Sequence, residues 1–175
     1  MSAEAPTTAG MTAAEVVATN AALDAKLLAE LEAADLGVPA PGEAEWSPIE
    51  VAAHLAEFPR FFAAELERWM SDRETTVGRT HDDAGRLAAV GAAPGTDPEE
   101  ARAAVAPAFA LLARVLERLE DADVAAETNN VKYGREPLSA FLDRYVVGHK
   151  AGHLEQLRAL ARRSGAGERP EGADR

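Results

Sequence analysis

The fold is decided by residues 46–62, which read WSPIEVAAHLAEFPRFF. Ser47 can cap a helix that Pro48 opens, and Glu50 completes a capping box. Beyond the cap, large apolar residues recur at helical spacing: Val51, Leu55, Phe58, Phe62 and Trp69. These signals predict a long amphipathic helix that runs to about Asp72.

Three further helices are predicted around this one, over residues 12–35, 98–119 and 137–163. Each carries a single apolar stripe, and the first also begins with a capping box. The connections over 73–97 and 121–136 are rich in glycine, proline or asparagine, and we found no period-two strand pattern. The sequence therefore predicts an all-α chain folded as an antiparallel four-helix bundle.

The helices predict one domain over residues 12–163. A small, polar segment, 1–11, is expected to be a flexible N-terminus, and the glycine-rich, charged stretch 164–175 a disordered tail. The chain has 175 residues, of which 47% are hydrophobic, enough for one core of ordinary size. Only 5% are aromatic, which favours close-packed helices over a β-sandwich.

The charge and cysteine content exclude several classes of function. The chain has 18 Lys and Arg against 30 Asp and Glu, a formal net charge of −12, and it has no cysteine. An acidic surface repels nucleic acid and anionic lipid, so neither is an expected partner. Without cysteine there is no thiolate metal site and no catalytic thiol. No signal peptide or membrane span is recognisable, so a soluble cytoplasmic protein is expected.

Two of the four histidines lie four positions apart on the predicted last helix. At 100° per residue from Leu138, His149 falls at about 20° and His153 at about 60°, within the apolar stripe. Their Cβ atoms would be roughly 6 Å apart, a spacing at which two imidazoles can bind one metal ion. Gln156 and Tyr145 fall on the same inward face, each one turn from a histidine. Each can orient an imidazole or simply bond to a neighbouring helix.

Other polar residues are placed by the same helical geometry. His54 lies at the edge of the core-facing stripe of the second helix, and Asn20 falls inward on the first helix, where it could also orient an imidazole. Glu57 could act as a general base one turn from His54, but its angle favours a solvated position. Lys150 and Glu155 point outward and are assigned no role.

The residues alone leave two interpretations of the inward histidines open. They can be core polar groups that are each satisfied by a hydrogen bond, because the spacing alone is weak evidence for a metal site. Alternatively, one metal ion can satisfy both, which avoids the roughly 1–3 kcal/mol cost of each unpaired buried polar group. His81 lies in the connection over 73–97 without a helical partner, and its role and that of the connection stay undecided.

Two segments together resemble the DinB/YfiT-like superfamily. Residues 46–62 are similar to its second helix, in which a Trp and a capping Ser precede a metal-binding histidine. Residues 133–160, YGREPLSAFLDRYVVGHKAGHLEQLRAL, are similar to its last helix, in which two histidines four apart are followed by Gln-Leu. The resemblance covers nearly the whole chain, roughly residues 12–163. Its specificity lies in the combination of both segments.

The resemblance implies a four-helix bundle, usually dimeric, that holds a divalent metal through His54, His149 and His153. Members of the family with assigned chemistry are mainly transferases and isomerases that use low-molecular-weight bacterial thiols, and others are described as metal-dependent hydrolases. The chain departs from the common pattern at Lys150, where an acidic residue is frequent, and at Glu136, where Thr or Ser usually caps the last helix. Neither departure removes a ligand.

Three neutral imidazoles suit Zn²⁺ or Ni²⁺ and leave a coordination position open, as in catalytic zinc sites. An external thiol could bind there as its thiolate. We therefore expect a metal-dependent transferase that activates a small thiol toward a small-molecule electrophile, and a homodimer. The alternatives are a metal-dependent hydrolase and a non-enzymatic metal- or ligand-binding stress-response protein. No residue is assigned as catalytic.

Overall fold

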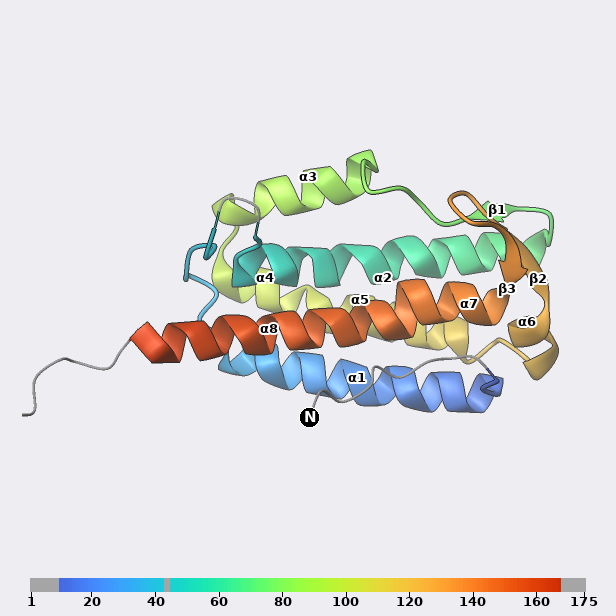
Figure 1. Cartoon of the computed structure of the whole chain (residues 1–175), viewed down its shortest axis with the longest axis horizontal. Helices are drawn as coiled ribbons and strands as arrows, with labels where there is room; N and C mark the ends of the chain where they lie inside the picture. The colour runs from blue at the N-terminus through green and yellow to red at the C-terminus, as the bar shows by residue number, and fades with distance from the viewer. Residues whose placement is uncertain (1–9, 43–44, 168–175) are drawn as a thin grey trace, which may run out of the picture.

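The computed structural model describes residues 10–42 and 45–167, and it is mostly helical. Its long helices lie side by side along the longest axis of the molecule (Figure 1). The principal helices are α1 (Ala13–Ala33), α2 (Pro48–Ser71), α5 (Val105–Leu116) and α8 (Gly148–Gly167). The helix starts predicted at Thr12 and Ser47 are confirmed, because each N–H donates to the carboxylate three residues on, at 2.8 and 2.7 Å.

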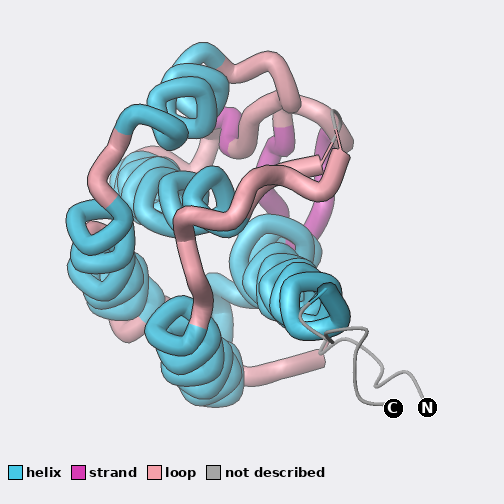
Figure 2. The backbone as a smooth tube through the Cα atoms, turned by 90° about the vertical axis from the view of Figure 1, so that its left-hand side faces the viewer, coloured by secondary structure: helices cyan, strands magenta, loops and turns pink. Residues whose placement is uncertain are grey.

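The principal helices close around one apolar core. Helix α2 packs against α5, and α1 packs against α8; α1 also contacts α5, and α2 also contacts α8. The view from one end shows the helices around this shared interior (Figure 2). Its largest fully buried apolar side chains are aromatic: Trp69, Phe58, Phe62 and Phe141. Full burial of one such side chain contributes about 1.5–3 kcal/mol.

The third predicted helix is divided. Helix α4 (Pro98–Ala103) ends before α5 begins at Val105. Pro107 explains the break, because it has no N–H to donate to the carbonyl of Ala103 four residues earlier. The predicted connections also contain short helices: α3 (Ala84–Ala92), η1 (Ala93–Gly95) and α6 (Asp121–Ala125).

A small sheet corrects the expectation of a purely helical chain. The strands are β1 (Thr76–Val77), β2 (Glu127–Asn130) and β3 (Gly134–Pro137). Strand β2 lies between the other two, parallel to β1 and antiparallel to β3. In β2 only Thr128 and Asn130 are buried, so its alternation is short and polar and gives no hydrophobic signal. Gly134 makes the hairpin turn possible with a φ of 71°.

The last predicted helix has three parts. Helix α7 (Leu138–Leu142) is followed by a π-helical turn, η2 (Asp143–Val147), and then by α8. Because α8 ends at Gly167, residues 164–167 are helical and do not belong to the tail expected from 164. The rest of that tail and residues 1–9 of the expected flexible N-terminus lie outside the described residues. Within the described part of the chain, no helix is long and apolar enough to cross a membrane.

Candidate metal centre

The π-helical turn sets the direction of the side chains on α8. The Gly148 N–H donates to the Asp143 carbonyl, five residues earlier. A turn of this kind holds one residue more than a regular turn, so the residues after it are rotated by roughly 100° from the uninterrupted wheel. Lys150 consequently takes the inward direction predicted for His149 and faces α1. His149 and His153 face α2, which carries His54.

The imidazoles of His54, His149 and His153 converge on one point. The Nε2 atom of His149 lies 2.9 Å from Nε2 of His54 and 3.2 Å from Nε2 of His153. One ring nitrogen from each residue lies within 4.8 Å of the other two. Nitrogen ligands about 2.0–2.1 Å from a tetrahedral zinc ion lie roughly 3.4 Å from one another. The three residues therefore form a group that could hold a metal ion.

The opposite ring nitrogens fit metal-ligating tautomers. His153 Nδ1 lies 2.9 Å from the Gln156 side-chain oxygen, which can only accept a hydrogen bond. A proton on Nδ1 leaves the lone pair of Nε2 directed at the centre. His54 Nδ1 lies 3.6 Å from the Glu57 carboxylate, slightly beyond hydrogen-bond range. Its proton is thus also attracted to the side away from the centre.

Burial keeps the three imidazoles neutral. It lowers the pKa of His149 to about 2, with the neighbouring His153 and His54 adding to the effect. Burial likewise lowers the pKa of His153 to about 4, and it lowers the pKa of His54 despite the nearby Glu57. Three neutral imidazoles whose lone pairs meet cannot satisfy one another by hydrogen bonds alone. A divalent cation fits this donor set, because nitrogen ligands bind in the neutral form.

Aromatic rings pack around the centre. Trp46 stacks on His153 with 6.0 Å between ring centroids and meets His54 edge-on at 5.1 Å. Phe58 lies edge-on to His149 at 4.7 Å. The low polarity of these walls strengthens any charge interaction at the centre.

Lys150 corrects the sequence-based expectation most clearly. It was expected to point outward, but its side chain is fully buried between α1 and α8. Its ammonium donates to Asn20 at 2.6 Å and pairs with Asp24, and it lies 4.4 Å from the centroid of the Phe109 ring. Asn20 is inward, as predicted, but its contacts are to Lys150 and Asp24 and not to an imidazole.

Glu57 is also less solvated than expected. Arg79 binds both oxygens of its carboxylate, at 2.5 and 2.7 Å. Burial raises the pKa of Glu57, but Arg79 and His54 outweigh that effect and lower the pKa to about 2. Such a carboxylate is a weak proton acceptor at neutral pH, so Glu57 does not suit the role of general base. It contacts His54 from the side and balances the charge of Arg79.

Tyr145 lies in the π-helical turn and packs against Phe62 and Phe141, with centroid distances of 5.0 and 5.1 Å. Its hydroxyl oxygen is buried and has no hydrogen-bond partner of ordinary geometry among the described residues. Burial raises the pKa of this phenol, so it keeps its proton at neutral pH. Tyr145 therefore does not orient an imidazole, and the side chain of Asn130 is the polar neighbour of its hydroxyl.

A cavity of about 160 Å³ adjoins the histidine group, with His54 and His149 in its wall. Tyr145 lines it, and four cationic residues that the sequence reasoning did not single out also line it: Arg79, Arg86, Lys132 and Arg144. His81 belongs to the same wall, where its Nε2 lies 3.4 Å from the Lys132 ammonium. The cavity gives a small molecule access to the imidazoles.

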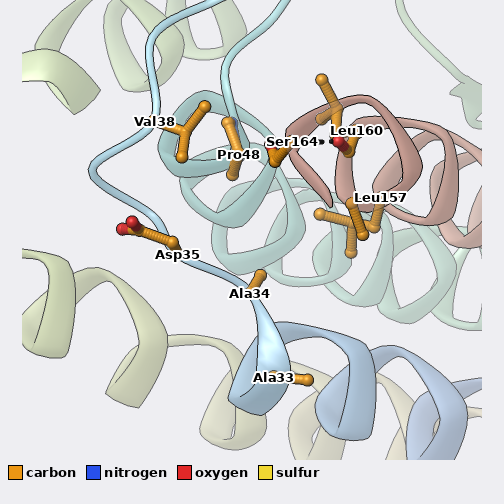
Figure 3. A pocket seen from close by; sticks show the side chains of 9 residues that line it. Ala33, Ala34, Asp35, Val38, Pro48, Leu157, Leu160 and Ser164 are labelled. Atoms are coloured by element: carbon orange, nitrogen blue, oxygen red, sulfur yellow. Dashed lines mark hydrogen bonds between the residues drawn. The ribbon is translucent and has the colours of Figure 1, made fainter. Parts of the chain in front are cut away.

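A larger cavity of about 270 Å³ lies between the end of α1, the start of α2 and the second half of α8 (Figure 3). Its wall is mostly apolar, with Val38, Pro48 and Leu160 among its members and Asp35 as its carboxylate. None of its described residues is a histidine or a cation. The histidine group and its neighbouring cations therefore lie at the cavity of about 160 Å³ and not at this one.

Comparison with known proteins identifies the family and the fold. The sequence profile of the DinB superfamily matches residues 19–157. No curated protein matches the chain. Among solved structures, mycothiol-dependent maleylpyruvate isomerase has a similar fold, with a TM-score of 0.63, 17% identity and 83% of this chain covered. A mutant of that enzyme has a TM-score of 0.64 and 16% identity, with 83% of this chain covered. This chain spans 62% of the length of those proteins.

Proposed function

Because this chain belongs to the DinB superfamily, we propose that it is a metal-dependent transferase that activates a low-molecular-weight thiol toward a small electrophile. The observation that carries the proposal is the convergence of three neutral imidazole nitrogens beside a cavity. The metal ligands are His54, His149 and His153, and the nitrogen donors favour Zn²⁺ or Ni²⁺.

The bound metal would supply a positive charge that stabilises a thiolate at neutral pH. The chain has no cysteine, so the thiol must be a substrate. The His153–Gln156 contact holds one ligand in the required tautomer, and Trp46 and Phe58 keep water from the ring faces. In the transfer, the thiol loses its proton to solvent, and the sulfur forms a bond to one carbon of an electrophilic double bond. The π bond breaks, and its electron pair takes up a proton from solvent at the neighbouring carbon.

The fold neighbours favour a thiol as co-substrate, since both are named as mycothiol-dependent enzymes. This support concerns only the region shared with this chain. We also propose that residues 12–163 form the domain, that the principal helices form a DinB-like four-helix bundle, and that two copies associate. The proposed location is the bacterial cytoplasm, and neither nucleic acid nor a membrane is a proposed partner.

The test is turnover of a chromogenic electrophile by the full chain loaded with zinc or nickel, with and without mycothiol or N-acetylcysteine. We expect a rate that requires both metal and thiol and that His149→Ala removes. Glu155→Gln, an exposed change on the same helix, should keep it. Hydrolysis without a thiol would favour the hydrolase alternative, and metal binding without turnover would favour a non-enzymatic binding protein. Either result would overturn the transferase proposal.

A further inference from the structure

The cavity beside the histidine group has a charge opposite to that of the protein. The chain carries a formal net charge of −12, yet four arginine and lysine residues line this cavity, and no Asp or Glu among the described residues lines it. The cations come from three separate parts of the chain. Arg79 and Arg86 belong to the segment after α2, Lys132 to the β2–β3 turn, and Arg144 to the π-helical turn.

Two of these cations are already neutralised. The two terminal guanidinium nitrogens of Arg79 donate to the two carboxylate oxygens of Glu57. One of them also donates to the Asp83 carboxylate at 3.1 Å. Arg144 binds the Glu136 carboxylate at 2.8 and 2.9 Å and lies over the Tyr133 ring. Their role is therefore to shape the wall, because their charges are matched by carboxylates behind it.

Arg86 and Lys132 have no carboxylate partner among the described residues. Arg86 donates one bond to the backbone carbonyl of His81, at 2.8 Å, and its guanidinium lies 5.1 Å from the Trp46 ring centroid. The Lys132 ammonium lies 3.4 Å from His81 Nε2 and 5.4 Å from the Tyr133 ring centroid. The remaining N–H donors of both residues are available to a ligand at the wall.

We propose that Arg86 and Lys132 form an anion subsite that binds the carboxylate of a small organic acid and thereby selects anionic electrophiles. This inference rests on the proposed transferase function and specifies its substrate class. The same cavity contains His54 and His149, so an acid held by the two cations lies next to the histidine group. Phe62 offers an apolar surface to its carbon chain, and the Tyr145 ring lies in the same wall.

The size and composition of the cavity favour an organic acid over free phosphate. A volume of about 160 Å³ accommodates a short carbon chain but is below the roughly 300–1,000 Å³ of sites for drug-sized ligands. Arg86 supplies a planar fork that matches a carboxylate, while aromatic rings make up much of the remaining wall. A site for phosphate alone would not use these apolar groups.

The test is calorimetric titration of the metal-loaded full chain with maleate, dimethyl maleate and inorganic phosphate. We expect maleate to bind, its neutral ester to bind at least tenfold more weakly, and the affinity for maleate to fall with salt. Arg86→Gln and Lys132→Gln should each weaken maleate binding about tenfold or more, and Arg86→Lys should weaken it less than Arg86→Gln. Arg118→Gln, which removes an exposed charge outside the cavity, should bind as the wild type does.

Equal binding of maleate by the wild type, Arg86→Gln and Lys132→Gln would overturn the subsite, since the acid would then be bound elsewhere, for instance at the metal. Phosphate binding tighter than maleate would overturn the assignment to an organic acid. Neither result would contradict the proposed thiol-dependent turnover, which is measured separately. Loss of thiol-dependent turnover with retained, Arg86-dependent maleate binding would instead remove the proposed reaction and keep the subsite.

Discussion

A Cβ atom on Gly148 would lie 2.6 Å from the carbonyl oxygen of Asp143. Real Cβ atoms do not approach backbone this closely, so any side chain at position 148 forces the π-helical turn to open or shift. This turn determines where His149 and Lys150 point. The glycine is therefore required by the geometry of the site, although its backbone has ordinary helical angles.

We expect Gly148→Ala to lower both the melting temperature and the metal content of the purified protein. The matched control is Gly152→Ala on the same helix, because a Cβ there meets no atom within 4 Å. That control should keep its metal and gain up to about 1 kcal/mol in unfolding free energy from the better helix former. Thermal melting and elemental analysis check both variants, and a Gly148→Ala protein with normal metal content would contradict the role of the turn.

Gln156→Ala should weaken metal affinity without unfolding the chain. Gln156 fixes the His153 tautomer through the 2.9 Å contact to Nδ1, and loss of such an outer contact typically costs 10–100-fold in metal affinity. Competition with a chromogenic chelator measures the change. Glu155→Ala, at the exposed neighbouring position, is the control and should bind metal with unchanged affinity. An unchanged affinity in Gln156→Ala would show that the contact does not support the centre.

Lys150→Ala should destabilise the fold strongly. It leaves Asp24 buried without its ion pair, a change that costs about 3–5 kcal/mol in comparable sites. The double variant Lys150→Met with Asp24→Leu should recover part of that loss, because it removes both charges and keeps an apolar volume. Urea denaturation gives the unfolding free energies. A Lys150→Ala variant as stable as the wild type would contradict the role of the buried ion pair in stability.

Acid should destabilise the metal-free protein. The pKa of His149 is lowered to about 2 and that of His153 to about 4, both below the ordinary value near 6.5, so the unfolded chain binds more protons than the folded one. The unfolding free energy should be flat with respect to these groups above about pH 6.5 and fall by up to about 1.4 kcal/mol per pH unit for each group below it.

Denaturation curves from pH 7.5 to 4.5 in the presence of chelator measure this dependence. His153→Gln should make the unfolding free energy fall less steeply below pH 6.5, because the variant lacks one imidazole whose pKa is lowered by folding. An identical slope in the variant and the wild type would assign the acid sensitivity to other groups.

Local signals in the sequence were sufficient for the principal helices and for the pairing of His149 with His153, while only the family resemblance implied that His54 joins them. Capping boxes at Thr12 and Ser47 mark helix starts through contacts within four residues, and the apolar period marks the buried faces. The i, i+4 spacing of His149 and His153 survives the rotation of α8 because both residues follow the π-helical turn. Their approach to His54 then follows from the contact between α2 and α8.

The remaining features depend on contacts between distant segments. A π-helical turn rotates the side chains that follow it around the helix axis, and no residue type in the sequence marks where it occurs. The direction of Lys150 could therefore not be obtained from a regular α-helical projection. The polar strand β2 pairs with β1 some fifty residues earlier, which periodicity within one segment does not reveal. Arg86 and Lys132 approach the cavity only because both connections fold over the same part of the molecule.

The most direct measurement is the metal content of the full chain after loading with zinc and desalting. We expect one ion per chain in the wild type and a loss of at least tenfold in affinity in His54→Ala, because the proposal makes His54 the ligand contributed by α2. His81→Ala, which changes the one histidine outside the cluster, should retain one ion. A wild-type protein without bound metal, or a His54→Ala variant that holds it as tightly, would contradict the three-histidine centre.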